Sequence, residues 1–153
     1  MAQVASSEAL SMVAASVSLS TNGTTWTDIS GYTNLIEQGE MSRPTGTVYT
    51  YTGDKAIIKA GKLQPLDLSV TLVYSEDTTA PYGTVLTAFQ TTGGATMYLK
   101  WSPKGGATGV KQYVTDAGII TKMNLPGGKS EGGDPVVVKF TLQTPFVTQS
   151  AVT

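Results

Sequence analysis

Few side chains in this sequence could do covalent or metal chemistry, and the residue types that are missing are the most informative. The 153 residues include no His and no Cys. The commonest general base, the commonest metal ligand and every thiolate site are therefore absent. This excludes a Ser-His-Asp triad, a Cys-His dyad and a His-ligated zinc centre. The lack of Cys also excludes disulfides, which is compatible with a reducing compartment.

The acidic side chains do not form a recognisable catalytic pair. Carboxylates lie close in sequence at Glu37/Glu40 and at Glu76/Asp77. Glycoside hydrolysis needs two carboxylates that face each other across a cleft. Here the first pair flanks a glycine at a predicted strand end, and the second precedes a predicted helix. We therefore expect no catalytic residues, no metal site and no cofactor.

Two further features indicate binding chemistry, but each also has a purely structural interpretation. The segment GGKS (127–130) has the ending of a phosphate-binding loop. That motif also requires Gly at position 123, where this chain has Met, and a helix afterwards, where it has EGGD. We expect a flexible loop there. Five aromatic residues could form a stacking platform for sugar or single-stranded nucleic acid, or could be half-buried strand residues: Tyr49, Tyr51, Tyr98, Trp101 and Tyr113.

The elements that would position these residues are mostly strands. The clearest strand covers 66–74, where alternate residues share one apolar face: Leu66, Leu68, Val70, Leu72 and Tyr74. Further strands are predicted at 13–20, 24–29, 34–40, 95–101 and 135–144. The segment 110–125 is predicted to be one long strand or a bent pair.

Two segments depart from this short-strand pattern. Over about 80–91 the apolar period changes to that of a helix, with Thr79 as a candidate cap, Pro81 in the first turn and Gly93-Gly94 after the end. Over about 46–62, Thr alternates with Val and Tyr without a strongly apolar face. The chain then turns near Gly53-Asp54 and returns through KAIIKAG. We expect a long extended hairpin or loop there.

The predicted fold class is therefore mainly β: a β-sandwich or partly closed barrel with one flanking α-helix. The length predicts a single domain, 1–153, with a flexible N-terminal arm (1–12) and a C-terminal tail (145–153). The start of the chain lacks the basic region of a signal peptide, and no uncharged run has the apolar density of a membrane helix. We expect neither export by the general route nor membrane insertion.

Charge is scarce and unevenly distributed. Only 14% of the residues are charged and the net charge is -1, whereas DNA-binding domains are usually basic. Residues 1–42 carry -4, residues 43–62 carry +3, residues 63–77 carry -3 and residues 100–122 carry +3, while 78–99 are uncharged. Such blocks suit self-complementary assembly, although solvated loops could also cluster by sign. The uncharged helix could be covered on both faces or could expose a wet, Thr-rich face.

Several stretches occur in an order that resembles a known family. LSVTLVYSED (68–77) leads into the aromatic helix, LKWSPKGG (99–106) follows it, and VKFTLQTP (138–145) forms the closing strand. In this order, and over nearly the whole chain, the sequence resembles the major tail tube proteins of long, non-contractile-tailed bacteriophages (siphophage type). Contractile-tail tubes and bacterial secretion-system tubes have similar folds, so the resemblance does not fix the type of tail.

The resemblance implies a structural subunit and not an enzyme. Such subunits form hexameric rings that stack into the hollow tube of a virion tail. Strands from all six copies join in an inner β-barrel, and the helix packs on its outside. The tube forms around a tape-measure protein in the host cytoplasm, meets tail-tip and tail-terminator proteins, and later passes double-stranded DNA.

The resemblance also implies roles for particular residues. The ribbon at 46–62 would reach the neighbouring ring, which would explain a strand pattern without a partner in its own chain. Its candidate inter-ring contacts are Thr47, Tyr49, Tyr51, Asp54, Lys55 and Lys59. In the helix, Tyr82, Leu86 and Phe89 are candidates for a subunit interface. Asp67 is the candidate for the lumen, where a neutral or acidic bore would let DNA slide.

An alternative function remains open at this point. A carbohydrate-binding β-sandwich module of a phage tail or surface protein would also be mainly β, weakly charged and free of catalytic residues. It would use the five aromatic residues named above as its stacking platform.

Overall fold

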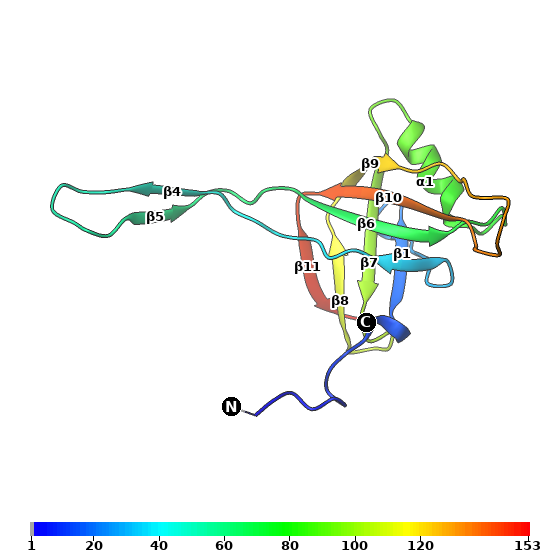
Figure 1. Ribbon diagram of the computed structural model, residues 1–153, viewed down its shortest axis with the longest axis horizontal. Helices are drawn as coiled ribbons and strands as arrows, with labels where there is room; N and C mark the ends of the chain where they lie inside the picture. The colour runs from blue at the N-terminus through cyan, green and yellow to red at the C-terminus, as the bar shows by residue number, and fades with distance from the viewer. Residues whose placement is uncertain (1) are drawn as a thin grey trace.

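The chain is mainly β, with one α-helix and one projecting hairpin, as the sequence predicts (Figure 1). The structure is a computed structural model and describes residues 2–153. The elements in chain order are η1 (Met12–Ala14), β1 (Ser16–Ser20), β2 (Thr27–Asp28), β3 (Thr33–Ile36), β4 (Thr45–Val48), β5 (Ile57–Ala60), β6 (Leu66–Val73), α1 (Pro81–Gln90), β7 (Thr96–Ser102), β8 (Lys111–Thr115), β9 (Gly118–Met123), β10 (Val137–Thr144) and β11 (Val147–Ala151).

The core is built on the pairing of β6 with β10. The two antiparallel strands match without interruption from Leu66↔Thr144 to Val73↔Val137. Seven of their apolar residues share one face, and that face is buried: Leu66, Leu68, Val70, Leu72, Val138, Phe140 and Leu142. The period-2 pattern of both strands is therefore confirmed, since alternate residues of a strand point to opposite faces of the sheet.

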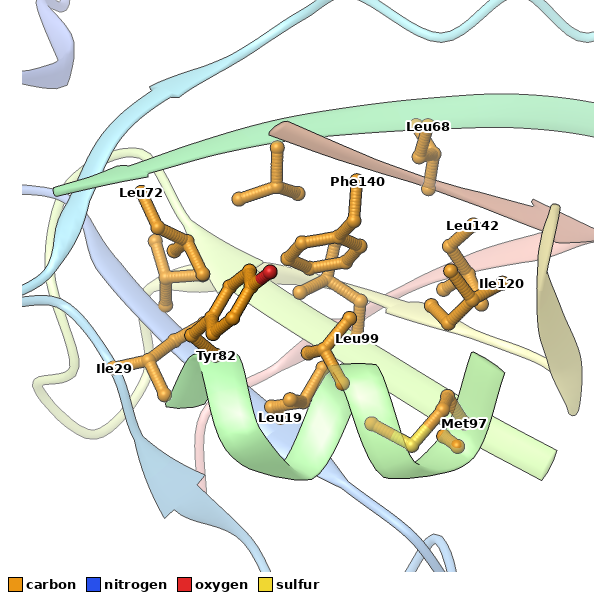
Figure 2. Close-up of a cluster of buried hydrophobic side chains, with 14 of the residues drawn as sticks. Leu19, Ile29, Leu68, Leu72, Tyr82, Met97, Leu99, Ile120, Phe140 and Leu142 are labelled. Carbon is orange, nitrogen blue, oxygen red and sulfur yellow. The ribbon is translucent and has the colours of Figure 1, made fainter. Parts of the chain in front are cut away.

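One nine-stranded antiparallel sheet folds over to form two layers, and β7 belongs to both. One layer contains β3, β6, β10 and β9, and the other contains β2, β1, β7, β8 and β11. β7 pairs with β9 through Thr96 and Met97, and with β1 and β8 further along its length. Leu19, Met97 and Leu99 of the second layer are buried against the first layer, so one core lies between them (Figure 2).

The helix α1 begins and ends close to the predicted positions. It buries Pro81 in its first turn, and Gly93 and Gly94 follow it with φ angles of +78° and +75°, which glycine adopts readily. The predicted cap at Thr79 is wrong, because Ala80 occupies the N-cap position and no side chain caps the helix. The Thr79 hydroxyl instead shares a hydrogen bond of 2.9 Å with the hydroxyl of Tyr32.

Two other segments take a form that depends on partners far away in the sequence. Of the two alternatives predicted for 110–125, the structure has the bent pair, β8 and β9. The predicted C-terminal tail at 145–153 contains β11, which pairs with β8 from Val147↔Thr115 to Ala151↔Lys111. Residues 2–11 are exposed and contain no strand or α-helix. The flexibility expected of the arm at 1–12 stays a prediction, and Met1 lies outside the described residues.

Gly118, at the start of β9, makes a close approach that only glycine allows. A Cβ at this position would lie 2.5 Å from the carbonyl oxygen of Gln143 and 2.9 Å from Cδ1 of Leu142. We therefore expect Gly118→Ala to lower the free energy of unfolding by about 1–3 kcal/mol, the usual cost of overpacking. Urea unfolding of the monomeric chain measures this effect.

Gly83 of α1 provides the matched control. A Cβ there would meet nothing within 4 Å, so Gly83→Ala should raise the free energy of unfolding by about 0.5–1 kcal/mol through helix propensity. Equal effects of the two substitutions would contradict the proposed crowding at Gly118.

Candidate assembly surfaces

The ribbon, defined here as residues 43–62, projects from the body of the protein (Figure 1). β4 and β5 pair with each other from Thr45↔Ala60 to Val48↔Ile57 and form a sheet of their own. At the base, Gly61 donates its N–H to the Pro44 oxygen at 2.6 Å. An isolated two-stranded hairpin is marginally stable in water, so this element lacks the support that a third strand or a helix would give.

The register of the ribbon shows that neither of its faces is polar throughout. Thr47 pairs with Ile58, and Val48 pairs with Ile57, and cross-strand partners lie on the same face. One face therefore carries Ile58, and the other carries both Val48 and Ile57. All three side chains are exposed. Because apolar residues are exposed on both sides of this thin element, the ribbon has two surfaces available for burial.

The six residues predicted for inter-ring contact all lie on this ribbon and are exposed: Thr47, Tyr49, Tyr51, Asp54, Lys55 and Lys59. Tyr51 near the tip is fully exposed. Sequence reasoning missed Val48, Ile57 and Ile58, although the alternation in the first strand and the paired isoleucines of the return strand were the available signals. Contact of these residues with another copy stays a prediction.

The three helix candidates separate into buried and exposed residues. Tyr82 is 9% exposed and belongs to the core of its own chain, beside Leu72 and Phe140 (Figure 2). Leu86 is half-buried and Phe89 is 41% exposed. The side of α1 that faces the core carries Tyr82, Val85 and Ala88. Leu86 and Phe89 each follow one of these buried residues in the sequence and therefore lie beside this side of the helix. These two residues remain available to a neighbour.

Asp67 lies on the polar outer face of the β6–β10 pair. It accepts a hydrogen bond of 3.1 Å from the side-chain amide of Gln143. On the same face, the Ser69 and Thr141 hydroxyls lie 2.9 Å apart, and Lys139 forms an ion pair of 2.7 Å with Glu37. Lys122 is level with Thr141 in the neighbouring strand β9. Two acids and two bases therefore leave this hydroxyl-rich face without net charge.

The nine-stranded sheet has three edge strands: the two-residue strand β2, which pairs with β1 alone, and the two ends of its main path. The path of paired strands begins at β11 and ends at β3. Each of these strands pairs on one side, with β8 and β6 respectively. A strand at the edge of a sheet presents unpaired backbone N–H and C=O groups, which a further strand can extend.

Two ionisable groups have a displaced pKa, and neither indicates acid–base catalysis. The Ser30 hydroxyl and backbone N–H donate to the Asp28 carboxylate at 2.5 and 2.8 Å and lower its pKa. Burial raises the pKa of the Tyr74 phenol, and the charge of Glu76 adds to the rise. At neutral pH both shifts favour the form that an ordinary carboxylate or phenol already has, whereas a general base or acid needs a pKa near 7.

The described residues bring together neither three metal-binding acids nor the five aromatic residues of the possible sugar platform. Among residues 2–153, no three acidic side chains gather into a possible metal site. Trp101 stacks on Tyr113, with ring centroids 5.5 Å apart, and both pack against the core. Tyr49 and Tyr51 lie far away on the ribbon (Figure 1). The five aromatic residues therefore do not form one platform. In the described part of the chain, no helix is long and apolar enough to cross a membrane.

Comparison with known proteins places this fold among tail-like assemblies. No family model matches the sequence, and no curated protein matches it at a significant level. A chain from the sheath–tube complex of an extracellular contractile injection system (PVC), in the extended state, is 16% identical. That match covers 98% of this chain and 100% of that one, with a TM-score of 0.73.

Two further solved structures have the same architecture. A chain from the sheath/tube terminator of the PVC system is 15% identical, covers 96% of this chain and 100% of that one, and has a TM-score of 0.76. A chain from the tail of an empty gene transfer agent particle is 10% identical, with coverage of 90% and 95% and a TM-score of 0.60. The chain therefore has a fold found in contractile injection systems and in gene transfer agent tails. At these identities the likeness establishes the fold alone.

Tyr82 yields a prediction that separates a core residue from an interface residue. Its hydroxyl is buried and has no hydrogen-bond partner within residues 2–153. An unsatisfied buried hydroxyl is costly, so Tyr82→Phe should leave the free energy of unfolding unchanged or raise it by about 1 kcal/mol. Tyr82→Ala should lower it by about 3–5 kcal/mol, because it leaves a cavity. Urea unfolding of the monomer distinguishes these outcomes. A large loss in Tyr82→Phe would show that the hydroxyl is bonded after all.

Proposed function

We propose that this chain is the structural subunit of a phage-like tail tube, in which copies form hexameric rings that stack into a hollow conduit for genome delivery. The observation that carries the proposal is the ribbon. It exposes apolar residues on both faces, and within residues 2–153 it pairs with no other element. Exposed apolar surface of this kind marks an interaction site, and the fold is one found in tail-like assemblies.

The ring is proposed to form through the free ends of the nine-stranded sheet. In a closed ring, each copy meets its neighbours through two different surfaces. β3 and β11 supply two such surfaces, since they end the path of paired strands. Backbone hydrogen bonds between copies would then satisfy the groups that are free in the single chain. Leu86 and Phe89 would add apolar contacts beside this joint.

The outer face of β6 and β10, which includes Asp67, is proposed to line the bore. Proteins hold DNA chiefly by neutralising its phosphates with Lys and Arg. On this face, Lys139 is paired with Glu37 and Lys122 is balanced by Asp67. A polar lining without net positive charge offers double-stranded DNA little to bind, which suits passage.

The same proposal includes the other proteins of the tail and the place where the tube is assembled. The tube would surround a tape-measure protein and end at tail-tip and terminator proteins, as part of a virion tail assembled in the host cytoplasm. The sequence resemblance favours a long, non-contractile tail. The solved structures of similar fold include contractile systems, so electron microscopy of the particle, with or without a contracted sheath, decides between the two.

Shortening the ribbon tests the proposed function directly. Replacing Thr47–Ile58 with Asn-Gly would join the paired residues Gly46 and Lys59 through a favoured two-residue turn. We expect a folded monomer whose free energy of unfolding changes by about 0.5 kcal/mol or less, because the ribbon forms its own sheet. We also expect the loss of tubes in negative-stain electron microscopy. Long tubes formed by this variant would contradict the proposal.

Single substitutions test whether both faces of the ribbon are covered. Val48→Thr and Ile58→Thr each make one face more polar while they keep the high strand propensity of a β-branched residue. Both variants should fold like the unsubstituted chain, and each should form fewer tubes at a given protein concentration in sedimentation. Thr45→Ser, near the base of the same strand, is the control and should assemble normally. Normal assembly of both test variants would show that the apolar residues of the ribbon stay exposed to solvent in the tube.

A further inference from the structure

The two ends of the molecule carry opposite charge. The ribbon contains four basic residues and one acid, a net charge of +3: Arg43, Lys55, Lys59 and Lys62 against Asp54. The loops at 74–80 and 124–136, called the acidic end here, contain four acids and one base, a net charge of -3: Glu76, Asp77, Glu131 and Asp134 against Lys129. All ten side chains are exposed.

The strand β6 holds these two groups apart. It begins next to the ribbon and ends at the acidic end, where Tyr74 donates its N–H to the Val136 oxygen at 2.8 Å and joins the two loops. Figure 1 shows the ribbon on the left and both loops on the right of the body. Eight residues of strand span about 26 Å, more than two Debye lengths at physiological salt. The charges of one copy therefore do not neutralise each other.

A groove lies beside the acidic end. It has a volume of about 610 Å³ and runs between the loop at 74–80 and the helix α1. Tyr74, Glu76 and Asp77 line one side, and Thr84 and Thr87 of α1 line the other. The segment 78–99 carries no charge, and within residues 2–153 no ion pair involves the acids of this end. The groove is thus acidic and partly aromatic, and no ion pair within the described residues offsets its negative charge.

We propose that the acidic end of one copy receives the ribbon tip of another copy, with Tyr51 in the groove and Lys55 against Glu76 and Asp77. This inference rests on the proposed function, because it requires copies to stack. The match is one of charge and of side-chain type: a fully exposed aromatic ring and a cation of the same tip loop meet a groove lined by acidic and aromatic residues. Partial burial strengthens such ion pairs relative to those in bulk water.

The same charges determine the polarity of the stack. Two ribbons that met each other would bring two charges of +3 together, and two acidic ends would bring together two of -3, so like-to-like contacts are disfavoured. A contact between two different surfaces of the same chain is head-to-tail and can repeat without closing. The stack therefore has every ribbon pointing in one direction.

Disulfide trapping tests the contact, because the chain contains no Cys of its own. One variant carries Tyr51→Cys and a second carries Thr84→Cys, and the two are mixed under assembly conditions with oxidised glutathione. A disulfide forms only where the Cα atoms come within about 7 Å. We expect a covalent dimer of the two variants on non-reducing gels. Tyr51→Cys mixed with Thr108→Cys is the control and should give none, because Thr108 is exposed in the loop that follows β7, at the opposite end of that strand from the groove.

Charge reversal provides an independent measurement. Lys55→Glu with Lys59→Glu, and separately Glu76→Lys with Asp77→Lys, should each raise the protein concentration needed for tubes at least about tenfold, because one side of the contact becomes repulsive. In an equal mixture, the ribbon of either variant meets an end of opposite charge on the other variant, so the mixture should form mixed dimers and alternating stacks that neither variant forms alone. A chain with all four substitutions should return to within about threefold of the original threshold, since both charges are exchanged.

The outcomes separate this contact from the proposed function. If the unsubstituted chain forms tubes, but trapping fails and both charge reversals assemble normally, the tip-to-groove contact is wrong and the tube subunit stands. If the unsubstituted chain never forms rings or tubes, the proposed function fails, and this inference fails with it. Reversal variants that assemble poorly without rescue in the fourfold variant would also overturn the contact.

Discussion

The antiparallel pairing of β6 with β10 is the interaction on which the rest of the structure depends. These are the two longest strands, and they match along their whole length. Their inner faces supply many of the largest fully buried side chains, among them Phe140, Leu68 and Leu72. At roughly 1.5–3 kcal/mol for each buried side chain of this size, this single pair supplies a large share of the hydrophobic stabilisation. It also gives the body a direction, from the base of the ribbon to the acidic end.

The second layer is attached to this pair through one crowded point. β7 leaves the layer of β6 and β10 where Gly118 passes the backbone of β10. With no side chain on Gly118, the chain comes close enough for β7 to belong to both layers, so the two apolar faces meet across one core. The buried helix residues Val85 and Ala88 then close the side of that core. The body thus has a continuous buried core, whereas all three of the apolar residues Val48, Ile57 and Ile58 on the strands of the ribbon stay exposed.

The ribbon and the acidic end are a consequence of this arrangement. Because β6 separates them, a weakly charged protein with a net charge of -1 has two ends of opposite sign. A chain with a complete core and two different, oppositely charged ends is suited to repetitive head-to-tail assembly. The polar face of β6 and β10 stays free of this role, since its acids and bases balance locally.

The sequence by itself determined the elements whose signals are local. The alternation in 66–74 and 135–144 identified β6 and β10, the change of period identified α1, and the missing His and Cys removed whole classes of chemistry. It also identified the ribbon, because Thr, Val and Tyr alternate there up to a Gly-Asp turn. Only the folded chain shows that 145–153 contains β11, that 110–125 is interrupted at 116–117 between β8 and β9, and that Tyr82 belongs to the core while Phe89 is exposed. It also shows that the loop with Glu131 and Asp134 joins the body at the same end as the loop with Glu76 and Asp77. The physical reason is that strand pairing and loop proximity join residues far apart in the chain, and local periodicity contains no information about such partners.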